Sequence, residues 1–233
     1  MDIGAKTGHE ENMKFFIDDL RLSPYTYSVL SALIEKGAPY EMKEVSFADN
    51  RSVTPAFAGR TFTDLIPAID DDGFVLSESL AILEYLEEKY PAPQYASIHP
   101  AKRSERAHAR MLLSWYRCGM QALRKERSTE TVFYPEARRP DGKPLPPLSA
   151  EAREEVADLA TCLKTILKPG APYLFGDRWS IADTETALML HRLILNGDEL
   201  DPGLREYAES LWNRPSIQEF VEHPRKPFRS YYA

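Results

Sequence analysis

The sequence contains 233 residues, of which 43% are hydrophobic and 28% charged, a composition typical of a soluble globular protein that buries a core without disulfides. Its net charge of −7 at pH 7 argues against a nucleic-acid-binding protein, which usually presents a basic face. No stretch approaches the ~20 apolar residues of a membrane span, and the first residues contain no apolar signal segment. We therefore expect a cytoplasmic protein that binds neither nucleic acid nor membrane.

The cysteines and histidines show no metal-binding pattern. Cys118 and Cys162 do not form a CxxC pair, which fits a reducing compartment. Both fall on or beside apolar stripes of expected helices, and we interpret them as inert packing residues. No two histidines stand at ligand spacing, so the sequence predicts no metal site; the five are His9, His99, His108, His191 and His223.

The first 91 residues alternate between strand and helix patterns. Residues 1–12 are polar and patternless, and we expect a flexible extension there. A short strand at 14–18 leads into Ser23 and Pro24, which have the form of an N-cap and a first helical position, and the helix ends at Gly37. Further strands are expected at 40–47, 65–70 and 74–76, and a helix at 80–90.

The helix expected at 80–90 begins just after a strand, at Glu78 and Ser79. The first turn of a helix has unpaired backbone N–H groups and the positive end of the dipole, so it can bind a carboxylate, with the Ser79 hydroxyl as an extra donor. A neighbouring acid such as Glu78 can hold an ammonium group. Together the two residues suit the α-carboxylate and α-amine of an amino acid. A plain helix cap with a favourable first-turn charge is the other interpretation, since such residues are common at helix starts.

The second half of the chain is predicted to be all helix. A long helix is expected from Pro100 to about Arg127, and a proline-rich loop at 135–147 is placed to form a lip over a site. The apolar stripe assigned to the long helix contains Ala107, Met111, Trp115, Cys118 and Ala122. Later helices are expected to begin at Ser149, at a capping box formed by Ser180 and Asp183, at Asp201, and at a second capping box formed by Ser216 and Glu219.

Four motifs in this order resemble the cytosolic glutathione transferases. Residues 76–86, reading LSESLAILEYL, look like the family's glutathione-holding motif, and residues 65–69 look like its cis-proline strand. Residues 23–25, reading SPY, look like the active-site turn of its serine and cysteine classes, and residues 175–183 contain its buried capping box. The resemblance spans about residues 14–222, and details that include residues 124–129, 132–133 and 197–199 are similar to a bacterial subgroup known as the YfcF type.

This resemblance implies an α+β fold with two domains. Residues 13–91 would form a thioredoxin-like βαβ-ββα domain that binds glutathione, and residues 92–99 a linker. Residues 100–233 would form an all-helical bundle. The family resemblance also implies a homodimer.

The resemblance also assigns a glutathione site. The γ-glutamyl end of glutathione would bind at Glu78 and Ser79, and the backbone of Ile66, held by a cis Pro67, would pair with the cysteinyl part like an added strand. An ordinary strand-edge proline is the alternative for Pro67. Many relatives carry a cation where this chain has Leu65, next to the glycyl carboxylate of glutathione. Replacements for that cation are sought among Arg60, Thr61 and Thr63.

Ser23 falls at the family's catalytic position, with Tyr25 beside it. A thiol has a pKa of about 8.5, so it is mostly protonated at neutral pH, and the nucleophile is the thiolate. A hydroxyl donor and a helix N-terminus aimed at the sulfur favour the charged form. Ser23 is therefore interpreted as a donor to sulfur and not as a nucleophile, with a plain N-cap as the alternative. A hydroxyl forms no mixed disulfide, which argues against that mechanism.

The electrophile is expected to bind between the domains. The candidate residues are Tyr25, Trp115, Arg124 and Arg127. Arg124 and Arg127 are spaced i,i+3, so they share one helix face and could meet an anionic substrate. Helix-end arginines are also common as solvated partners of the helix dipole, and Trp115 lies on a core stripe, so structural roles stay open for all three.

The resemblance therefore implies a glutathione transferase, with glutathione as co-substrate, no metal, and a small electrophile or peroxide as second substrate. Glutathione-dependent peroxidase and disulfide reductase activities are alternatives served by the same residues. A non-catalytic interaction or regulatory module of the same fold is the second hypothesis, favoured by Leu65 in place of a cation. A thioredoxin-type oxidoreductase is the third, and the absence of a CxxC pair counts against it.

Overall fold

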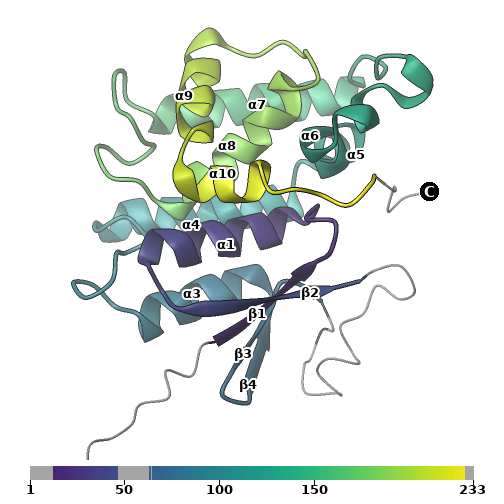
Figure 1. The fold of residues 1–233 in the computed structure, drawn as a ribbon. Helices are drawn as coiled ribbons and strands as arrows, with labels where there is room; N and C mark the ends of the chain where they lie inside the picture. Colours follow the sequence, from purple (N-terminus) through teal and green to yellow (C-terminus); the bar gives the residue numbers. More distant parts are fainter. Residues whose placement is uncertain (1–12, 47–62, 64, 229–233) are drawn as a thin grey trace, which may run out of the picture.

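The computed structural model describes residues 13–46, 63 and 65–228 of the chain. The extension expected at 1–12 and most of the connection from 47 to 64 lie outside the described residues. Figure 1 shows a small sheet at one end of the molecule and a group of helices at the other, with helix α1 between them. Across the described part of the chain, no helix is long and apolar enough to cross a membrane.

The sheet is mixed and four-stranded, with the order β2-β1-β3-β4. Its strands are β1 (Met13–Asp18), β2 (Tyr40–Val45), β3 (Ala68–Asp71) and β4 (Phe74–Ser77). β2 runs parallel to β1, whereas β3 and β4 are antiparallel to their neighbours. Helices α1 (Pro24–Lys36) and α3 (Ser79–Lys89) complete a thioredoxin-like domain, as predicted. Pro67 precedes β3 instead of interrupting it, and the Ile66–Pro67 peptide bond is cis.

Helix α1 begins and ends where its sequence indicates. Ser23 is the N-cap, and its hydroxyl oxygen accepts a hydrogen bond of 3.2 Å from the Thr26 backbone N–H. Pro24 follows at the first helical position, where its missing N–H is not needed. Gly37 ends the helix at φ 66°, a left-handed conformation that favours glycine.

The second half of the chain is all helix, as predicted. The helices are α4 (Arg103–Cys118), α5 (Gln121–Glu126), α6 (Thr129–Phe133), α7 (Ala150–Ile166), α8 (Ile181–Ile194), α9 (Pro202–Trp212) and α10 (Pro215–Val221). Two short 3₁₀ helices, η1 (Pro135–Arg138) and η2 (Pro140–Gly142), lie in the proline-rich segment.

The single long helix expected from Pro100 to Arg127 is wrong, because the chain breaks between α4 and α5. Gly119 is extended there and Met120 has φ 55°, so the hydrogen-bond ladder cannot continue. The indole of Trp115 lies against Gly119, where an added Cβ would stand 2.8 Å from Trp115 Cδ1. This close approach requires glycine at the break.

The buried face assigned to α4 is also wrong. The helix buries Ala109, Leu112, Leu113 and Tyr116, whereas most of the predicted stripe faces outward. Cys118, expected to be a packing residue, is exposed. The buried residues and the predicted stripe both recur at helical spacing. Packing against α8 is what buries the set that begins at Ala109.

The predicted capping box at the start of α8 is confirmed, and the one at the start of α10 is wrong. Asp183, which is fully buried, accepts a hydrogen bond of 2.8 Å from the Ser180 backbone N–H. In α10 the N-cap is Arg214, without a side-chain cap. The Ser216 hydroxyl instead donates to the Glu35 carboxylate of α1, a contact between segments 181 residues apart that local spacing cannot indicate.

Helix α1 is buried between the sheet and the helical half. Its Tyr27 is fully buried, packs edge-on against the Phe220 ring at 5.5 Å, and donates a hydrogen bond of 3.2 Å to the Thr184 carbonyl of α8. One hydrophobic cluster runs from Met13 in β1 to Phe220 in α10. The N-terminal end of α1 therefore lies at the boundary between the two halves of the molecule.

Candidate active site

The register of the sheet brings the three sequence motifs to one end of it. Phe16 of β1 is opposite Ala68 of β3, and Ala68 is opposite Ser77 of β4. Because β3 is antiparallel to both neighbours, the residues after β1, before β3 and after β4 all leave the sheet at this end. These residues are the Ser23 turn, the Ile66–Pro67 segment and the Glu78–Ser79 pair.

The Ser23 turn is held by a buried acid. Asp18, which is 1% exposed, accepts hydrogen bonds from the backbone N–H groups of Leu22 at 2.5 Å and Ser23 at 3.3 Å. As the N-cap, the Ser23 hydroxyl uses its oxygen to accept from Thr26. A serine hydroxyl has one hydrogen as well as two lone pairs, so it can cap the helix and still donate to a ligand.

The capping interpretation placed Ser79 at the helix cap and Glu78 in the first turn, and the structure exchanges these two positions. Glu78 is at the N-cap of α3, exposed, with φ 72° and no side-chain cap bond, and Ser79 is the first helical residue, with its side chain buried. A non-glycine residue at such a φ is uncommon and costs on the order of 1 kcal/mol, and residues of this kind cluster at functional sites.

Arg117 of α4 joins the two halves of the site and was missed by the sequence analysis. Its guanidinium donates a hydrogen bond of 2.9 Å to the Ser79 hydroxyl oxygen, and two bonds of 2.6 and 2.8 Å to the Glu185 carboxylate of α8. Burial alone would lower the pKa of Arg117, but the Glu185 carboxylate raises it above its usual value. Glu185 was the available signal, because an acid inside the apolar run that forms α8 requires a cation.

The bond from Arg117 determines what the Ser79 hydroxyl can do next. Its oxygen accepts from a cation, so its hydrogen is left to donate to an acceptor. A carboxylate placed there would receive the Ser79 hydroxyl and the free backbone N–H groups at the start of α3. Glu185 is held in turn by the Ser28 hydroxyl of α1 at 2.5 Å.

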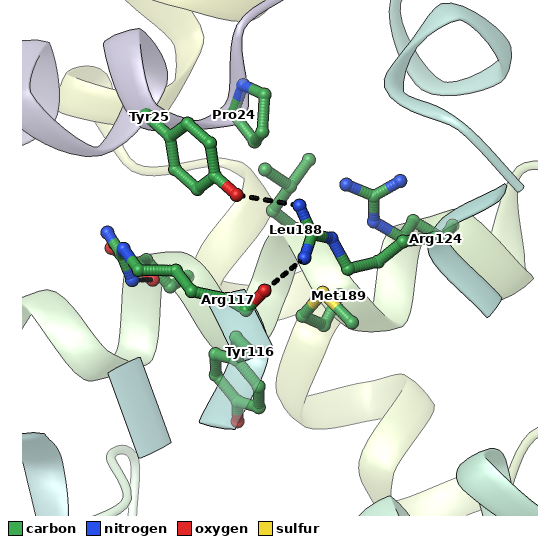
Figure 2. Close-up of a pocket in the computed structure, with 9 residues that line it drawn as sticks. Pro24, Tyr25, Tyr116, Arg117, Arg124, Leu188 and Met189 are labelled. Carbon is green, nitrogen blue, oxygen red and sulfur yellow. Dashed lines mark hydrogen bonds and ion pairs between the residues drawn. The ribbon is translucent and has the colours of Figure 1, made fainter. Parts of the chain in front are cut away.

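A pocket opens beside the Ser23 turn, between the start of α1, the α4–α5 break and α8 (Figure 2). Arg124 of α5 donates hydrogen bonds of 2.6 Å to the Tyr25 hydroxyl and to the Arg117 carbonyl. The residues that line the pocket are Pro24, Tyr25, Tyr116, Arg117, Arg124, Glu185, Leu188, Met189 and Arg192. Of the four electrophile-binding candidates, the structure brings together Tyr25 and Arg124.

Arg127 and Trp115 do not line this pocket. Arg127 is buried and forms bonds of 2.6 and 2.8 Å with the Asp198 carboxylate, because the turn after α8 brings that acid to its side of α5. Trp115 stacks on Tyr116, with ring centroids 6.2 Å apart, and covers Gly119. Both residues therefore have structural roles here.

The segment before β3 is only partly described. Leu65 is 51% exposed, and Pro67 is buried. The hydroxyls of Thr63 and Ser77 lie 2.7 Å apart, which places Thr63 beside the end of β4. The other two residues considered as replacements for a cation, Arg60 and Thr61, lie outside the described residues. In the part of the chain that the structure describes, no group of three or more His, Cys, Asp or Glu is placed to hold a metal ion.

The fold and the site define a thioredoxin-like domain joined to a helical domain, with a candidate ligand site where the two meet. Family models match on both sides of this junction: the glutathione S-transferase N-terminal domain matches residues 19–94, and the glutathione S-transferase C-terminal domain matches residues 102–226. The chain belongs to the glutathione S-transferase family.

Individual relatives agree with this assignment. A crystal structure of a glutathione transferase homolog from Burkholderia gl BGR1, with bound glutathione, is 32% identical, covers 91% of this chain and 97% of its own, and superposes with a TM-score of 0.72. The chain is also 27% identical to glutathione S-transferase theta-3 of Mus musculus over 64% of its length, and 34% identical to maleylpyruvate isomerase of Ralstonia sp over 42% of it. It spans 60% and 45%, respectively, of the lengths of these two relatives.

Proposed function

We propose that this protein is an enzyme that binds glutathione, keeps it as the thiolate and transfers it to a soft electrophile. The observation that carries the proposal is the meeting of the Ser23 turn, the Ile66–Pro67 segment and the Glu78–Ser79 pair at one end of the sheet. The homolog solved with bound glutathione adds the ligand that such a site takes. Glutathione is then the co-substrate, and a homodimer of the YfcF-type subgroup in the cytoplasm is part of the same proposal.

The site residues are proposed to divide the tripeptide between them. The γ-glutamyl carboxylate receives the Ser79 hydroxyl and the start of α3, and the exposed Glu78 carboxylate holds the γ-glutamyl amine. The backbone of Ile66, before Pro67, pairs with the cysteinyl part. Leu65 lies nearest the glycyl end and contributes no charge there.

Ser23 is proposed to stabilise the thiolate by donating its hydroxyl hydrogen to sulfur, with Tyr25 at the mouth of the adjoining pocket. The sulfur forms a bond to the electrophilic carbon, the leaving group departs with the electron pair, and the thiol proton passes to solvent. The Ser23 hydroxyl and the start of α1 lower the thiol pKa and so raise the thiolate fraction at neutral pH.

Substitution of Ser23 tests this role. In Ser23→Ala the lost donor raises the thiol pKa, so we expect a fall in kcat/KM at pH 7 of about tenfold that is partly recovered as the pH rises, read from a rate–pH profile with glutathione and an aromatic halide. The substitution also removes a helix cap worth ~1 kcal/mol. Ser149→Ala is the matched control, because Ser149 caps α7 in the same way, accepting from Ala152 at 3.1 Å, and lies outside the pocket. An unchanged profile would remove Ser23 from the mechanism.

A non-catalytic module of the same fold is the second candidate, and the exposed Leu65 in place of a cation favours it. Calorimetric titration with glutathione separates the two candidates. The enzyme should give binding heat that Ser79→Ala or Glu78→Gln reduces, whereas a module without a glutathione site should give none. Assays with an organic hydroperoxide or a mixed disulfide, at the same glutathione concentration, test the peroxidase and reductase alternatives.

A further inference from the structure

The pocket beside Ser23 contains a cation, Arg124, that the transferase chemistry alone does not require. Three arginines line it, Arg117, Arg124 and Arg192, against the single carboxylate of Glu185. Glu185 is fully engaged by Arg117, at 2.6 and 2.8 Å. The pair is neutral, so Glu185 does not compensate the charge of Arg124.

Arg124 differs from its neighbours in what holds it. Arg127, the C-cap residue of α5, is paired with Asp198, and Arg110 and Arg214 are paired with Glu84 and Glu35. Arg124 instead donates to the Tyr25 hydroxyl and the Arg117 carbonyl, and among the described residues no acid forms an ion pair with it. Its guanidinium lies 5.9 Å from the centroid of the Tyr25 ring (Figure 2).

A half-buried cation held only by neutral groups gains most from an anion, because burial removes solvent and no internal counter-charge repays it. The planar guanidinium has five N–H donors, of which these two bonds use two, and it matches a carboxylate with two parallel bonds. Pro24, Leu188 and Met189 also line the pocket. The chemistry points to a ligand that carries a carboxylate.

The position of the pocket fixes the orientation of such a ligand. Pro24 and Tyr25 directly follow Ser23, the proposed donor to the glutathione sulfur, and both line the pocket. A carboxylate on Arg124 therefore leaves the apolar part of the molecule on the side of the sulfur. We propose that the carboxylate of the electrophile of the proposed transferase reaction binds to Arg124 in this pocket, and that Arg124 selects electrophiles that carry a carboxylate; this inference rests on the proposed function.

The test uses two activated aromatic chlorides that differ in charge, 4-chloro-3,5-dinitrobenzoate and its methyl ester. In both, the glutathione sulfur bonds to the ring carbon, the carbon–chlorine bond breaks, chloride takes the electron pair and the thiol proton passes to solvent. We expect Arg124→Gln to lower kcat/KM about ten- to hundredfold for the acid, the effect of a charged hydrogen-bonded pair, and less than about twofold for the ester. Arg124→Lys keeps the positive charge but loses the two-bond geometry of the guanidinium. Its kcat/KM for the acid is expected to lie between the values of wild type and Arg124→Gln.

Lys125→Gln is the matched control, because it removes one positive charge from the next, exposed position of α5 outside the pocket. This variant is expected to leave kcat/KM for the acid and for the ester unchanged. Calorimetry with the two reaction products, the S-aryl glutathione acid and its ester, repeats the comparison without turnover, and Arg124→Gln should weaken the acid about tenfold more than the ester.

Equal effects of Arg124→Gln on acid and ester, in rate and in product affinity, would overturn the inference. If wild-type protein binds glutathione and Arg124→Gln shows no such difference, this inference alone fails and the proposed function stands. If wild-type protein does not bind glutathione, the proposed function fails and takes the inference with it.

Discussion

Arg117 shows how one side chain can determine the chemistry of residues on three other elements. It fixes Glu185 on α8 and the Ser79 hydroxyl on α3, and its guanidinium lies 5.2 Å from the centroid of the Tyr25 ring at the start of α1. Because Ser79 accepts from Arg117, its hydrogen is directed to whatever binds at the start of α3. A residue of the helical half thus orients Ser79, which belongs to the proposed glutathione site.

Replacing Arg117 is expected to reduce both stability and glutathione affinity. Arg117→Gln leaves the Glu185 carboxylate buried without its cation, which costs about 3–5 kcal/mol of unfolding free energy, and it removes the bond that orients Ser79. Urea unfolding gives the first quantity, and the Kd for glutathione gives the second.

Arg110→Gln provides the control for Arg117→Gln. Arg110 is on the same helix and also forms a two-bond pair with an acid, Glu84, but its side chain is 48% exposed and that of Glu84 is 39% exposed. An exposed pair contributes about 0–1 kcal/mol, so the control should unfold almost like wild type. Equal losses in the two variants would contradict the assignment of Arg117 as a buried bridge.

At the scale of elements, local signals predicted the starts of helices and long-range packing decided the rest. The caps at Ser23, Ser149, Ser180 and Asp201 were predicted correctly, because each depends on residues within one turn. The break at Gly119 depends on where the Trp115 indole lies, and the role of Ser216 depends on Glu35 in another domain. The orientation of the Trp115 side chain, although it is only four residues from Gly119, and the contact of Ser216 with Glu35 cannot be read from spacing along the chain.

The candidate site follows the same division. The family motifs predicted which residues lie at the end of the sheet, and strand register brings those segments there. Arg124 and Arg127 are indistinguishable in sequence, because their i,i+3 spacing predicts that both lie on one face of a helix. In the structure Arg127 forms a buried ion pair with Asp198, whereas Arg124 bonds to Tyr25 and lines the pocket.

Helix α8 contains a histidine whose burial predicts a pH dependence of stability. The His191 ring stacks on Trp212 at 3.7 Å, and burial, together with repulsion by Arg205, lowers its pKa from 6.5 to about 4 although Nδ1 lies 2.8 Å from the Ala187 carbonyl. Below pH 6.5 the unfolded chain binds a proton that the folded protein does not, so stability falls as the pH drops toward about 4, by about 3 kcal/mol in all.

The variant His191→Phe tests this pH dependence because it keeps an aromatic ring on Trp212 and removes the titrating group. Urea unfolding between pH 7 and pH 4 should show a shallower loss of stability than in wild type. His108→Asn, which replaces an exposed histidine of α4, is the control for the removal of a histidine. An equally steep loss in His191→Phe would assign the pH dependence to other groups.

For the whole molecule, α1 belongs to two packing units at once. It follows β1 in the sheet domain, yet Tyr27 bonds to α8 and the Ser31 hydroxyl donates to the Ser216 carbonyl of α10 at 3.3 Å. Glu35, at its end, forms two bonds of 2.8 Å with Arg214. Removing the helical half would expose these side chains, so the sheet domain has no independent core on that face.

We therefore expect one cooperative unfolding transition for both halves. All three tryptophans, Trp115, Trp179 and Trp212, belong to the helical half, so urea unfolding followed by their fluorescence reports on that half, and hydrogen exchange of β1 and β3 amides reports on the sheet. The two midpoints should coincide, and Arg214→Gln, which breaks the pair with Glu35, should lower both equally. Separate midpoints, or a shift confined to the fluorescence, would mean that α1 does not couple the halves and that the site between them opens before either unfolds.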